Sequence, residues 1–354
     1  MNNVLSKLFN NQLELMNHIG NENNASVYDG VYNNNSKMTN VIIKMIPRKD
    51  IKYIDQMLIE IGFLKYLSGF KTSLQYINVC YSIKLSSEYL IIVLEKPNGR
   101  TLKDIIENYK FSNWDEYYKF IKVIMFRLLL AINYIHSKGV AHRGLNPETI
   151  YIDYVDGFVN QLKISDFAVS CGNYESINYE NQRKKTKGSS QSSKTQKKTI
   201  YNRVCETINL DINPPENFKL SKLIARIKQL STNQTRESIY LYLAKKADVW
   251  SLGILFWKLL NRKSLDESPL DLKFPTNYNQ NLSWKTLPID INNKSVLGDI
   301  NGKDNFDIMN AFFKIVVDLM LNKIPSRGKS DEILEKFITT NKYYYIDKDS
   351  WILR

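Results

Sequence analysis

The chain has 354 residues, of which 43% are hydrophobic and 24% are charged. These ordinary values exclude a chain that is disordered throughout, and they permit one two-lobed domain or two small domains. The formal net charge is +13, and the run Arg183–Thr199 contributes seven Lys or Arg and no acid. A basic chain can bind nucleic acid, an anionic membrane or an acidic protein. Because the run has no aromatic residue for base stacking, we interpret it as a solvated loop and keep nucleic-acid binding as a less favoured alternative.

Cysteine and histidine usage argues against a zinc site. There are only three His, and the three Cys form no close pair and no metal-type spacing: Cys80, Cys171 and Cys205. Scattered thiols fit a reducing compartment. The N-terminus lacks the pattern of a signal peptide, and the apolar stretch Phe120–Ser137 is interrupted by Lys122 and Arg127. We therefore expect no membrane span and an intracellular protein, either cytoplasmic or nuclear.

The first hundred residues are predicted to be mostly strand with one helix. Apolar and β-branched runs separated by polar turns predict three strands at Leu13–Ile19, Ser26–Val31 and Asn40–Ile46. Helical spacing of apolar residues follows at Tyr53–Leu67. Two further runs, Asn78–Leu85 and Tyr89–Leu94, predict a hairpin around Ser86-Ser87.

After Pro97-Asn98-Gly99 the pattern becomes helical. Four helices are predicted at Leu102–Tyr109, Trp114–Ser137, Ala247–Leu260 and Phe306–Leu321. The second of these has an apolar face that is made by Phe120, Val123, Ile124, Leu128, Ala131, Ile132 and Ile135. The change from strands to helices predicts an α+β protein of two lobes with a hinge near Glu95–Gly99.

The predicted boundaries divide the chain into four parts. They are an N-terminal extension (1–12), an N-lobe (13–96), a C-lobe (97–340) and a C-terminal tail (341–354). Two inserts are expected in the C-lobe, a basic low-complexity segment at 172–200 and a second segment at 218–243. The second insert has apolar residues at helical spacing, which indicates an amphipathic helix that packs on the C-lobe or binds a partner.

Several short motifs occur in a fixed order along the chain. Val41-Ile42-Ile43-Lys44 ends a strand, and Glu60 lies in the next helix. These are followed by His142-Arg143-Gly144-Leu145-Asn146-Pro147-Glu148-Thr149, Asp166-Phe167-Ala168, Pro214-Pro215-Glu216, Asp248-Val249-Trp250-Ser251-Leu252-Gly253 and Arg327. Each motif alone is weak, but the ordered set resembles the signature of protein kinases from about Leu13 to Phe337. The resemblance implies a bilobal protein-kinase-like fold, and Pro147-Glu148 favours the serine/threonine class.

Three departures from the kinase pattern fall in the catalytic loop. The resemblance puts Gly144 where kinases have the Asp that accepts the proton of the substrate hydroxyl, Asn146 where they have a charge-neutralising Lys, and Thr149 where they have a magnesium-binding Asn. Catalysis in this fold depends on positioning and electrostatics. Loss of base, cation and metal ligand together therefore predicts an impaired enzyme, or pseudokinase.

The nucleotide site is partly retained in the sequence. By resemblance, Lys44 and Glu60 form the ion pair that positions phosphates, and Asp166 binds magnesium. Three more positions match nucleotide-binding positions of kinases: Gly20, Val27 and Glu95. The phosphate loop keeps only its first Gly, however, and Glu22 adds negative charge there.

The adenine pocket is predicted to be partly filled. Ile42 stands where kinases have a small Ala, and Tyr151 stands where they have a Leu. We hypothesise that these two larger side chains complete the core without nucleotide. Eight other positions match scaffold residues of kinases: Leu64, Val79, His142, Arg143, Phe167, Glu216, Asp248 and Arg327. Of these, Arg327 is expected to pair with Glu216.

The sequence thus predicts a kinase scaffold with an eroded active site. The favoured function is binding of a protein, such as an active kinase or its substrate, with the chain as scaffold or allosteric regulator and no cofactor required. Weak binding of ATP and Mg stays open. One alternative is a divergent, active serine/threonine kinase, and another is a binder of nucleic acid or an anionic surface through the basic run.

Overall fold

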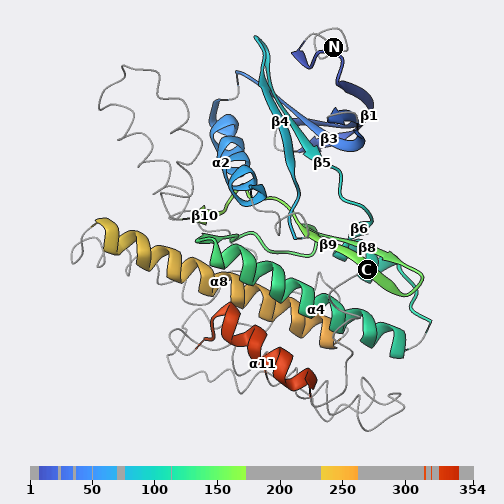
Figure 1. Ribbon diagram of the computed structural model, residues 1–354, viewed down its shortest axis with the longest axis vertical. Coiled ribbons are helices and arrows are strands. Elements are labelled where there is room, and N and C mark those ends of the chain that lie inside the picture. The colour runs from blue at the N-terminus through green and yellow to red at the C-terminus, as the bar shows by residue number, and fades with distance from the viewer. Residues whose placement is uncertain are drawn as a thin grey trace, which may run out of the picture.

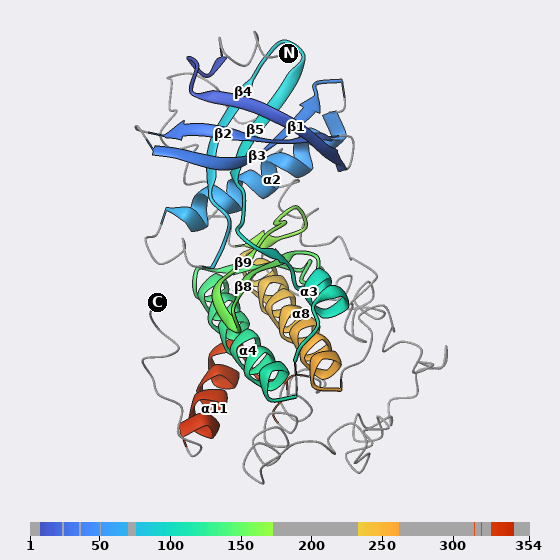
Figure 2. The same cartoon turned by 90° about the vertical axis from the view of Figure 1, so that its right-hand side faces the viewer.

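A computed structural model describes residues 8–22, 25–34, 37–49, 51–69, 76–112, 114–172, 233–261, 315, 320 and 327–342. The N-terminal part forms a sheet with one helix, and the helices of the C-terminal part lie below it (Figure 1). The predicted two-lobed α+β organisation is confirmed. Figure 2 shows helix α2 under the sheet, on the side of the helical lobe.

The N-lobe sheet has five antiparallel strands in the order β1-β2-β3-β5-β4. Their bounds are β1 Leu13–Glu22, β2 Ala25–Asn34, β3 Lys37–Pro47, β4 Cys80–Leu85 and β5 Tyr89–Glu95. Helix α2 spans Ile51–Ser68 between β3 and β4. All five predicted strands and the helix are found, and the Ser86 N–H closes the β4–β5 turn on the Tyr89 carbonyl (2.8 Å).

The outer face of this sheet has its own small core. Successive side chains of a strand point to opposite faces, so a continuous apolar run requires burial on both sides. On β3 and β5 the outward residues form a cluster with Phe9 and Leu13, and its other members are Val41, Ile43, Met45, Ile91 and Val93. The inward residues, among them Ile46, Ile92 and Leu94, join the main core.

Phe9 corrects the predicted start of the N-lobe at residue 13. Its side chain is only 2% exposed, and its ring meets Tyr32 edge-on at a centroid distance of 6.5 Å. Gln12 continues the contact, because its carbonyl accepts the Asn33 N–H (2.7 Å). Residues 8–12 are therefore part of the lobe. The short apolar pair Leu8-Phe9, followed by polar residues, gave no periodic signal that could have shown this.

The C-lobe begins with short elements and one long helix. They are β6 Arg100–Thr101, α3 Leu102–Asn108, α4 Trp114–Ser137, β7 Val140–Ala141, β8 Ile150–Val155, β9 Phe158–Ile164 and β10 Cys171–Gly172. Helices α3 and α4 were predicted, and the Thr101 hydroxyl caps α3 by accepting the Asp104 N–H (3.1 Å). The β8–β9 hairpin was not predicted, although Asp156-Gly157 is a strong turn signal.

Helix α4 is the centre of the helical lobe. Six of the seven residues of its predicted apolar face are buried, and the seventh, Val123, packs against the core from a half-buried position. Lys119–Ser137, with a mean hydropathy of 1.4, is long and apolar enough to cross a membrane by length and composition. The charges of Lys122 and Arg127 therefore do not exclude a membrane span, contrary to the prediction. However, 56% of this stretch is buried inside the protein. Packing in the core explains its apolar character.

Helix α8 includes the last part of the predicted second insert at 218–243, which as a whole stays a prediction. It runs without a break over Asn233–Asn261, so residues 233–243 belong to the same helix as the predicted Ala247–Leu260 segment. Helix α11 spans Ser330–Lys342 and was not predicted. The basic segment beyond Gly172, the amphipathic segment around Leu220–Leu230 and most of the predicted Phe306–Leu321 helix lie outside the described residues.

Gly99 allows the hinge to pass close to the C-lobe. Its φ is +83°, and a Cβ at this position would collide with the Ile152 carbonyl of β8. Only glycine combines this backbone conformation with so close an approach. The connection between the lobes is thus pressed against the β8–β9 hairpin immediately after β5.

Replacing Phe9 by Ala tests whether residues 8–12 belong to the lobe. We expect the free energy of unfolding to fall by about 3 kcal/mol, because a buried aromatic side chain is removed from a packed cluster. Met38→Ala is the matched control, since Met38 is 63% exposed and should change stability by less than about 0.5 kcal/mol. Equal effects of the two substitutions in urea unfolding would contradict the assignment.

Candidate active site

The predicted ion pair between sheet and helix is formed. Lys44 on β3 and Glu60 on α2 approach to 3.8 Å between Nζ and Oε1, and both side chains are almost completely buried. Strand β3 is paired with β2 and β5 on both sides, which fixes the face from which Lys44 projects. A lysine here could hold the phosphates of a nucleotide, as the resemblance implies.

The Glu95 side chain, at the hinge, is bonded within the protein, and its predicted part in nucleotide binding stays a prediction. Its Oε1 accepts a hydrogen bond from the Lys163 ammonium, and its Oε2 accepts the Val79 N–H at 3.1 Å. The Glu95 N–H in turn donates to the Val79 carbonyl (2.7 Å). The carboxylate is thus used inside the protein to tie β5 to β9 and to the residues before β4.

Lys163 is a structural residue that the sequence did not reveal. It lies on β9 among apolar neighbours and is 2% exposed, so its charge needs a partner. The next residue strengthens the same connection, because the Ile164 N–H donates to the Tyr76 carbonyl (2.8 Å). A lysine in an apolar strand indicates a buried partner, but nothing in the sequence pointed to Glu95.

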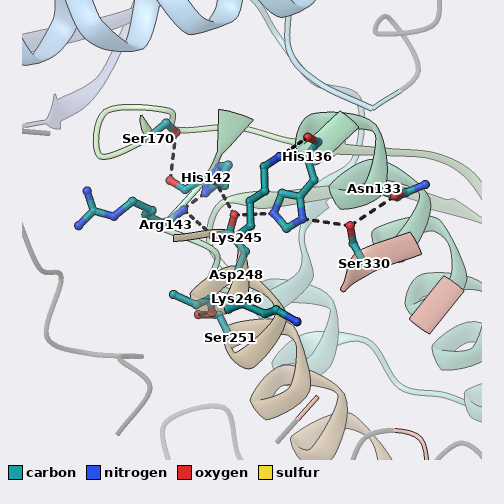
Figure 3. Close-up of polar contacts among 12 residues, drawn as sticks. Asn133, His136, His142, Arg143, Ser170, Lys245, Lys246, Asp248, Ser251 and Ser330 are labelled. Atoms are coloured by element: carbon teal, nitrogen blue, oxygen red, sulfur yellow. Dashed lines mark hydrogen bonds and ion pairs between the residues drawn. The ribbon is translucent and has the colours of Figure 1, made fainter. Parts of the chain in front are cut away.

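The catalytic loop is held by Asp248, as predicted. The carboxylate of Asp248, a fully buried residue of α8, accepts the N–H groups of His142 (2.7 Å) and Arg143 (2.6 Å). The Nε2 of His136, on α4, lies 2.9 Å from the same carboxylate. Figure 3 shows these groups converging. On the opposite side of the His136 ring, Nδ1 lies 3.0 Å from the hydroxyl of Ser330, the first residue of α11. Arg143 has a φ of +66°, so the bonds to Asp248 stabilise a conformation that is rare for residues other than glycine.

His142 is held as a neutral ring. Its Nε2 donates to the Ser165 carbonyl (2.9 Å), and its Nδ1 accepts the Gly144 N–H (3.2 Å). Burial lowers the pKa of His142, although the nearby Asp248 and Asp166 carboxylates oppose this shift. The neutral form matches the hydrogen bonds, because a protonated Nδ1 could not accept from Gly144.

Asn146 and Thr149 bond to their own loop. Asn146 Oδ1 accepts the N–H groups of Glu148 (2.8 Å) and Thr149 (3.1 Å), and its Nδ2 donates to the Gly144 carbonyl (3.3 Å). The buried Thr149 hydroxyl donates to the Asn146 carbonyl (3.0 Å). Such local bonds are typical of Asn and Thr in turns. The side chains of Asn146 and Thr149 therefore stabilise the loop, at positions where the resemblance implies that kinase side chains face the substrate and the metal.

Gly144 is covered by the segment that follows Asp166. A Cβ built on Gly144 would lie 2.9 Å from Val169 Cγ2, which is too close without a shift of Val169. The next residue fixes this segment, because the Ser170 hydroxyl donates to the His142 carbonyl (3.0 Å). The position of the missing catalytic base is thus occupied in part by an apolar side chain.

Asp166, the predicted magnesium ligand, lies at a sharp turn after β9. Its φ of +62° turns the chain sharply, and its Oδ1 accepts the Ala168 N–H (3.2 Å). A carboxylate oxygen suits magnesium. Within the described parts of the chain, however, no three His, Cys, Asp or Glu come together as a metal-binding group. The residues therefore fit a nucleotide with its metal only in part, through Lys44 and Asp166.

The apolar column between the lobes is present with one correction. Leu64, His142 and Phe167 are each at most 1% exposed, and the rings of His142 and Phe167 meet at 4.7 Å. Val79 is only half-buried and uses its backbone to bind Glu95, so its predicted place in the column is wrong. Cys80, one residue later, is buried in the main core with Leu64 and Phe167.

The remaining nucleotide positions lie along β1, β2, β3 and β8. The β1–β2 pairing continues to Glu22 opposite Ala25, with Gly20 opposite Val27, so the altered phosphate loop is a hairpin. Ile42 packs against the main core, whereas Tyr151 is a half-buried residue of β8. Filling of the adenine pocket by Ile42 and Tyr151 together stays a prediction.

Arg327 anchors the chain ahead of α11. Its Nη1 donates to the Lys246 carbonyl (2.9 Å), the Lys246 ammonium donates to the Arg327 carbonyl, and the guanidinium stacks over Trp250 at 4.9 Å. Burial lowers the pKa of Lys246. The predicted partner Glu216 lies outside the described residues, so this pairing is untested.

This arrangement of lobes, ion pair and braced loop is the bilobal protein-kinase fold. The chain belongs to the protein kinase family, because residues 13–191, about half of its length, match the family model of the protein kinase domain.

Curated relatives are serine/threonine kinases of limited similarity. A probable serine/threonine-protein kinase fhkA of Dictyostelium discoideum is 31% identical over 164 residues, which are 44% of this chain and 26% of the relative. Calcium-dependent protein kinase 5 of Plasmodium berghei is 32% identical over 38% of this chain and 23% of the relative. MAP kinase-interacting serine/threonine-protein kinase 1 of Xenopus laevis is 23% identical over 62% of this chain and 43% of the relative. The chain thus spans less than half the length of each.

A double-mutant cycle on Lys163 and Glu95 tests the tie between the lobes. Lys163→Met leaves the Glu95 carboxylate without its cation, and Glu95→Gln leaves a buried ammonium, so each should cost about 3 kcal/mol of unfolding free energy. The double variant should cost clearly less than the sum, because neither charge is then left unpaired.

The exposed pair Lys103–Glu148, at 3.0 Å, provides the control for this cycle. Lys103→Met should cost less than about 1 kcal/mol, because water screens an exposed pair. Additive effects at Lys163 and Glu95, measured by urea unfolding, would refute their coupling.

Proposed function

We propose that this chain is a catalytically impaired member of the protein kinase family that acts by binding another protein, as a scaffold or allosteric regulator. The observation that carries the proposal is the use of Asn146 and Thr149 inside their own loop, next to a Gly144 that has no side chain. Phosphoryl transfer needs a base, a positive charge and metal ligands at these three positions. The protein partner is expected to be an active kinase or a kinase substrate.

Nucleotide binding is a separate matter from transfer. The buried Lys44–Glu60 pair and Asp166 support weak binding of ATP with magnesium. The hinge carboxylate of Glu95 is taken by Lys163, and Glu22 adds negative charge beside the phosphate position. We therefore propose a function that requires no cofactor.

The second candidate is a divergent, active serine/threonine kinase. It is favoured by the intact ion pair, by Asp166 and by the names of the relatives. Such an enzyme would need a base from outside the catalytic loop. The third candidate, binding of nucleic acid or an anionic surface by the basic run, depends on residues outside the described parts of the chain.

ATP titration separates these functions. Because Ile42 and Tyr151 are predicted to fill the adenine pocket, we expect any binding through Lys44 and Asp166 to be too weak to raise the melting temperature with ATP, with or without magnesium. We also expect no transfer of radiolabel from ATP to the chain or to a basic protein. Ile42→Ala combined with Tyr151→Leu is predicted to produce a thermal shift by opening the adenine pocket. Transfer that disappears in Lys44→Met and Asp166→Ala would overturn the proposal in favour of the active kinase.

The contact between Gly144 and Val169 gives a second prediction. Gly→Ala at a permissive site usually stabilises a protein by about 0.4–1 kcal/mol, but Gly144→Ala should destabilise this one because its Cβ meets Val169 at 2.9 Å. In a Val169→Ala background the cost should largely disappear. For the same reason, Gly144→Asp alone should not restore transfer. Independent effects of the two positions in urea unfolding would contradict this view of the loop.

A further inference from the structure

A short bridge, Pro97-Asn98-Gly99, joins the two lobes between β5 and β6 (Figure 1). On the N-lobe side the chain is fixed just before the bridge, because the Lys96 N–H donates to the Asn40 carbonyl (3.3 Å). On the C-lobe side the pairing of β6 with β8 starts at Arg100 opposite Ile152. The bridge is therefore short and is held at both ends.

The groups of Asn98 and Gly99 that could react with each other are available. Asn98 is exposed, and its side-chain amide has no hydrogen-bond partner among the described residues. The Gly99 N–H donates to no carbonyl of the turns and loops that the structure describes, and Gly99 lies one residue before β6. Glycine also lacks the Cβ that would shield its nitrogen from the preceding side chain. The Asn98 amide carbon and the Gly99 nitrogen can therefore approach each other.

Asn40 shows the contrasting situation in the same lobe. It is also exposed, but the residue that follows it is Val41, which lies in β3 between the paired strands β2 and β5. The two ladders fix the backbone of Val41, and its branched side chain hinders approach to its own nitrogen. Exposure alone thus does not make an asparagine of this chain reactive, and Asn98 differs from Asn40 in the residue that follows it.

From these observations we infer that Asn98 is a site of spontaneous covalent modification by intramolecular deamidation. The Gly99 nitrogen attacks Asn98 Cγ, the Cγ–Nδ2 bond breaks, and ammonia leaves with the proton from Gly99. The resulting five-membered succinimide is opened by water at either of its carbonyls, which gives aspartate or isoaspartate at position 98. Water is the one further reactant, and asparagine is among the thermolabile residues of proteins. The inference goes beyond the proposed function and does not depend on whether the chain transfers phosphate.

The aspartate product should be tolerated. Lys96 and Arg100 flank position 98, and they are paired at exposed sites with Asp29 (3.5 Å) and Asp104 (3.6 Å). A new carboxylate between two exposed cations gains little, because water screens such pairs. Asn98→Asp carries this charge without any change in the length of the main chain.

The isoaspartate product should strain the hinge. In isoaspartate the main chain runs through the former side chain and gains one carbon atom before Gly99. Gly99 has a φ of +83°, and a Cβ on it would collide with the Ile152 carbonyl of β8. The bridge therefore has no room to move toward β8, so the added carbon must displace the chain at Lys96 or at Arg100. We expect isoaspartate to lower the stability of the connection between the lobes.

The test incubates the purified full chain at neutral pH and follows its tryptic peptides by mass spectrometry. Trypsin does not cut Lys96–Pro97, so Asn98 is the only side-chain amide of the peptide Leu85–Arg100, and Asn40 is the only one of Met38–Lys44. We expect progressive loss of unmodified Leu85–Arg100, with the mass shift of an amide-to-acid conversion and isoaspartate among the products. Met38–Lys44 should stay unmodified.

Asn98→Gln is the matched control, because the longer side chain would have to close a six-membered ring and should stay intact. The incubated chain should melt at a lower temperature than the fresh chain, whereas incubated Asn98→Gln and fresh Asn98→Asp should melt with the fresh chain. The inference is wrong if Leu85–Arg100 is converted no faster than Met38–Lys44, because the hinge then protects Asn98. It is also wrong if incubation lowers the melting temperature of Asn98→Gln as much as that of the unmodified chain.

Discussion

The carboxylate of Asp248 is the constraint on which the shape of the active site depends. It accepts two successive backbone N–H groups, from His142 and Arg143, and it is paired with His136. These bonds hold Arg143 in a left-handed conformation that would otherwise cost about 1–3 kcal/mol. Because the brace uses backbone donors of the loop, it is insensitive to which side chains the following positions carry. A glycine at position 144 is therefore compatible with a well-formed loop although it has no side chain.

Hydrogen bonds also explain why the loop is well formed without the residues that kinases carry at three of its positions. In an active site, a base, a cation and a metal ligand must be kept apart from one another and directed at the substrate. Their polar groups therefore lack hydrogen-bond partners until the substrate binds. Here Asn146 and Thr149 satisfy each other and the Gly144 carbonyl, and Val169 covers Gly144. Local hydrogen bonds thus stabilise this loop, and under the proposed function they take the place of a preorganised polar site.

The sequence predicted the fold and the retained motifs well, because periodicity and ordered motifs encode them. Strands with apolar runs and helix α4 followed from patterns within single segments, whereas the Lys44–Glu60 pair and the Asp248 brace followed from the resemblance to protein kinases. The errors concern contacts between segments. Cys80, and not the predicted Val79, is buried in the core with the other column residues. The sequence could not distinguish the two positions, because the short segment before β4 has no periodic pattern. Likewise, the partner of Glu95 is a lysine 68 residues away in a strand that was not predicted.

The retained residues Lys44, Glu60 and Asp166 differ from the loop positions Gly144 and Thr149 in what they reveal about function. Lys44, Glu60 and Asp166 each also serve the fold, since the first two neutralise one another between sheet and helix and the third turns the chain before Phe167. Loss of any of them would leave a buried charge or a strained turn. Retention of the ion pair and of Asp166 is thus weak evidence for phosphoryl transfer, and the proposal of an impaired enzyme depends on the three loop positions, where kinases use side chains for chemistry.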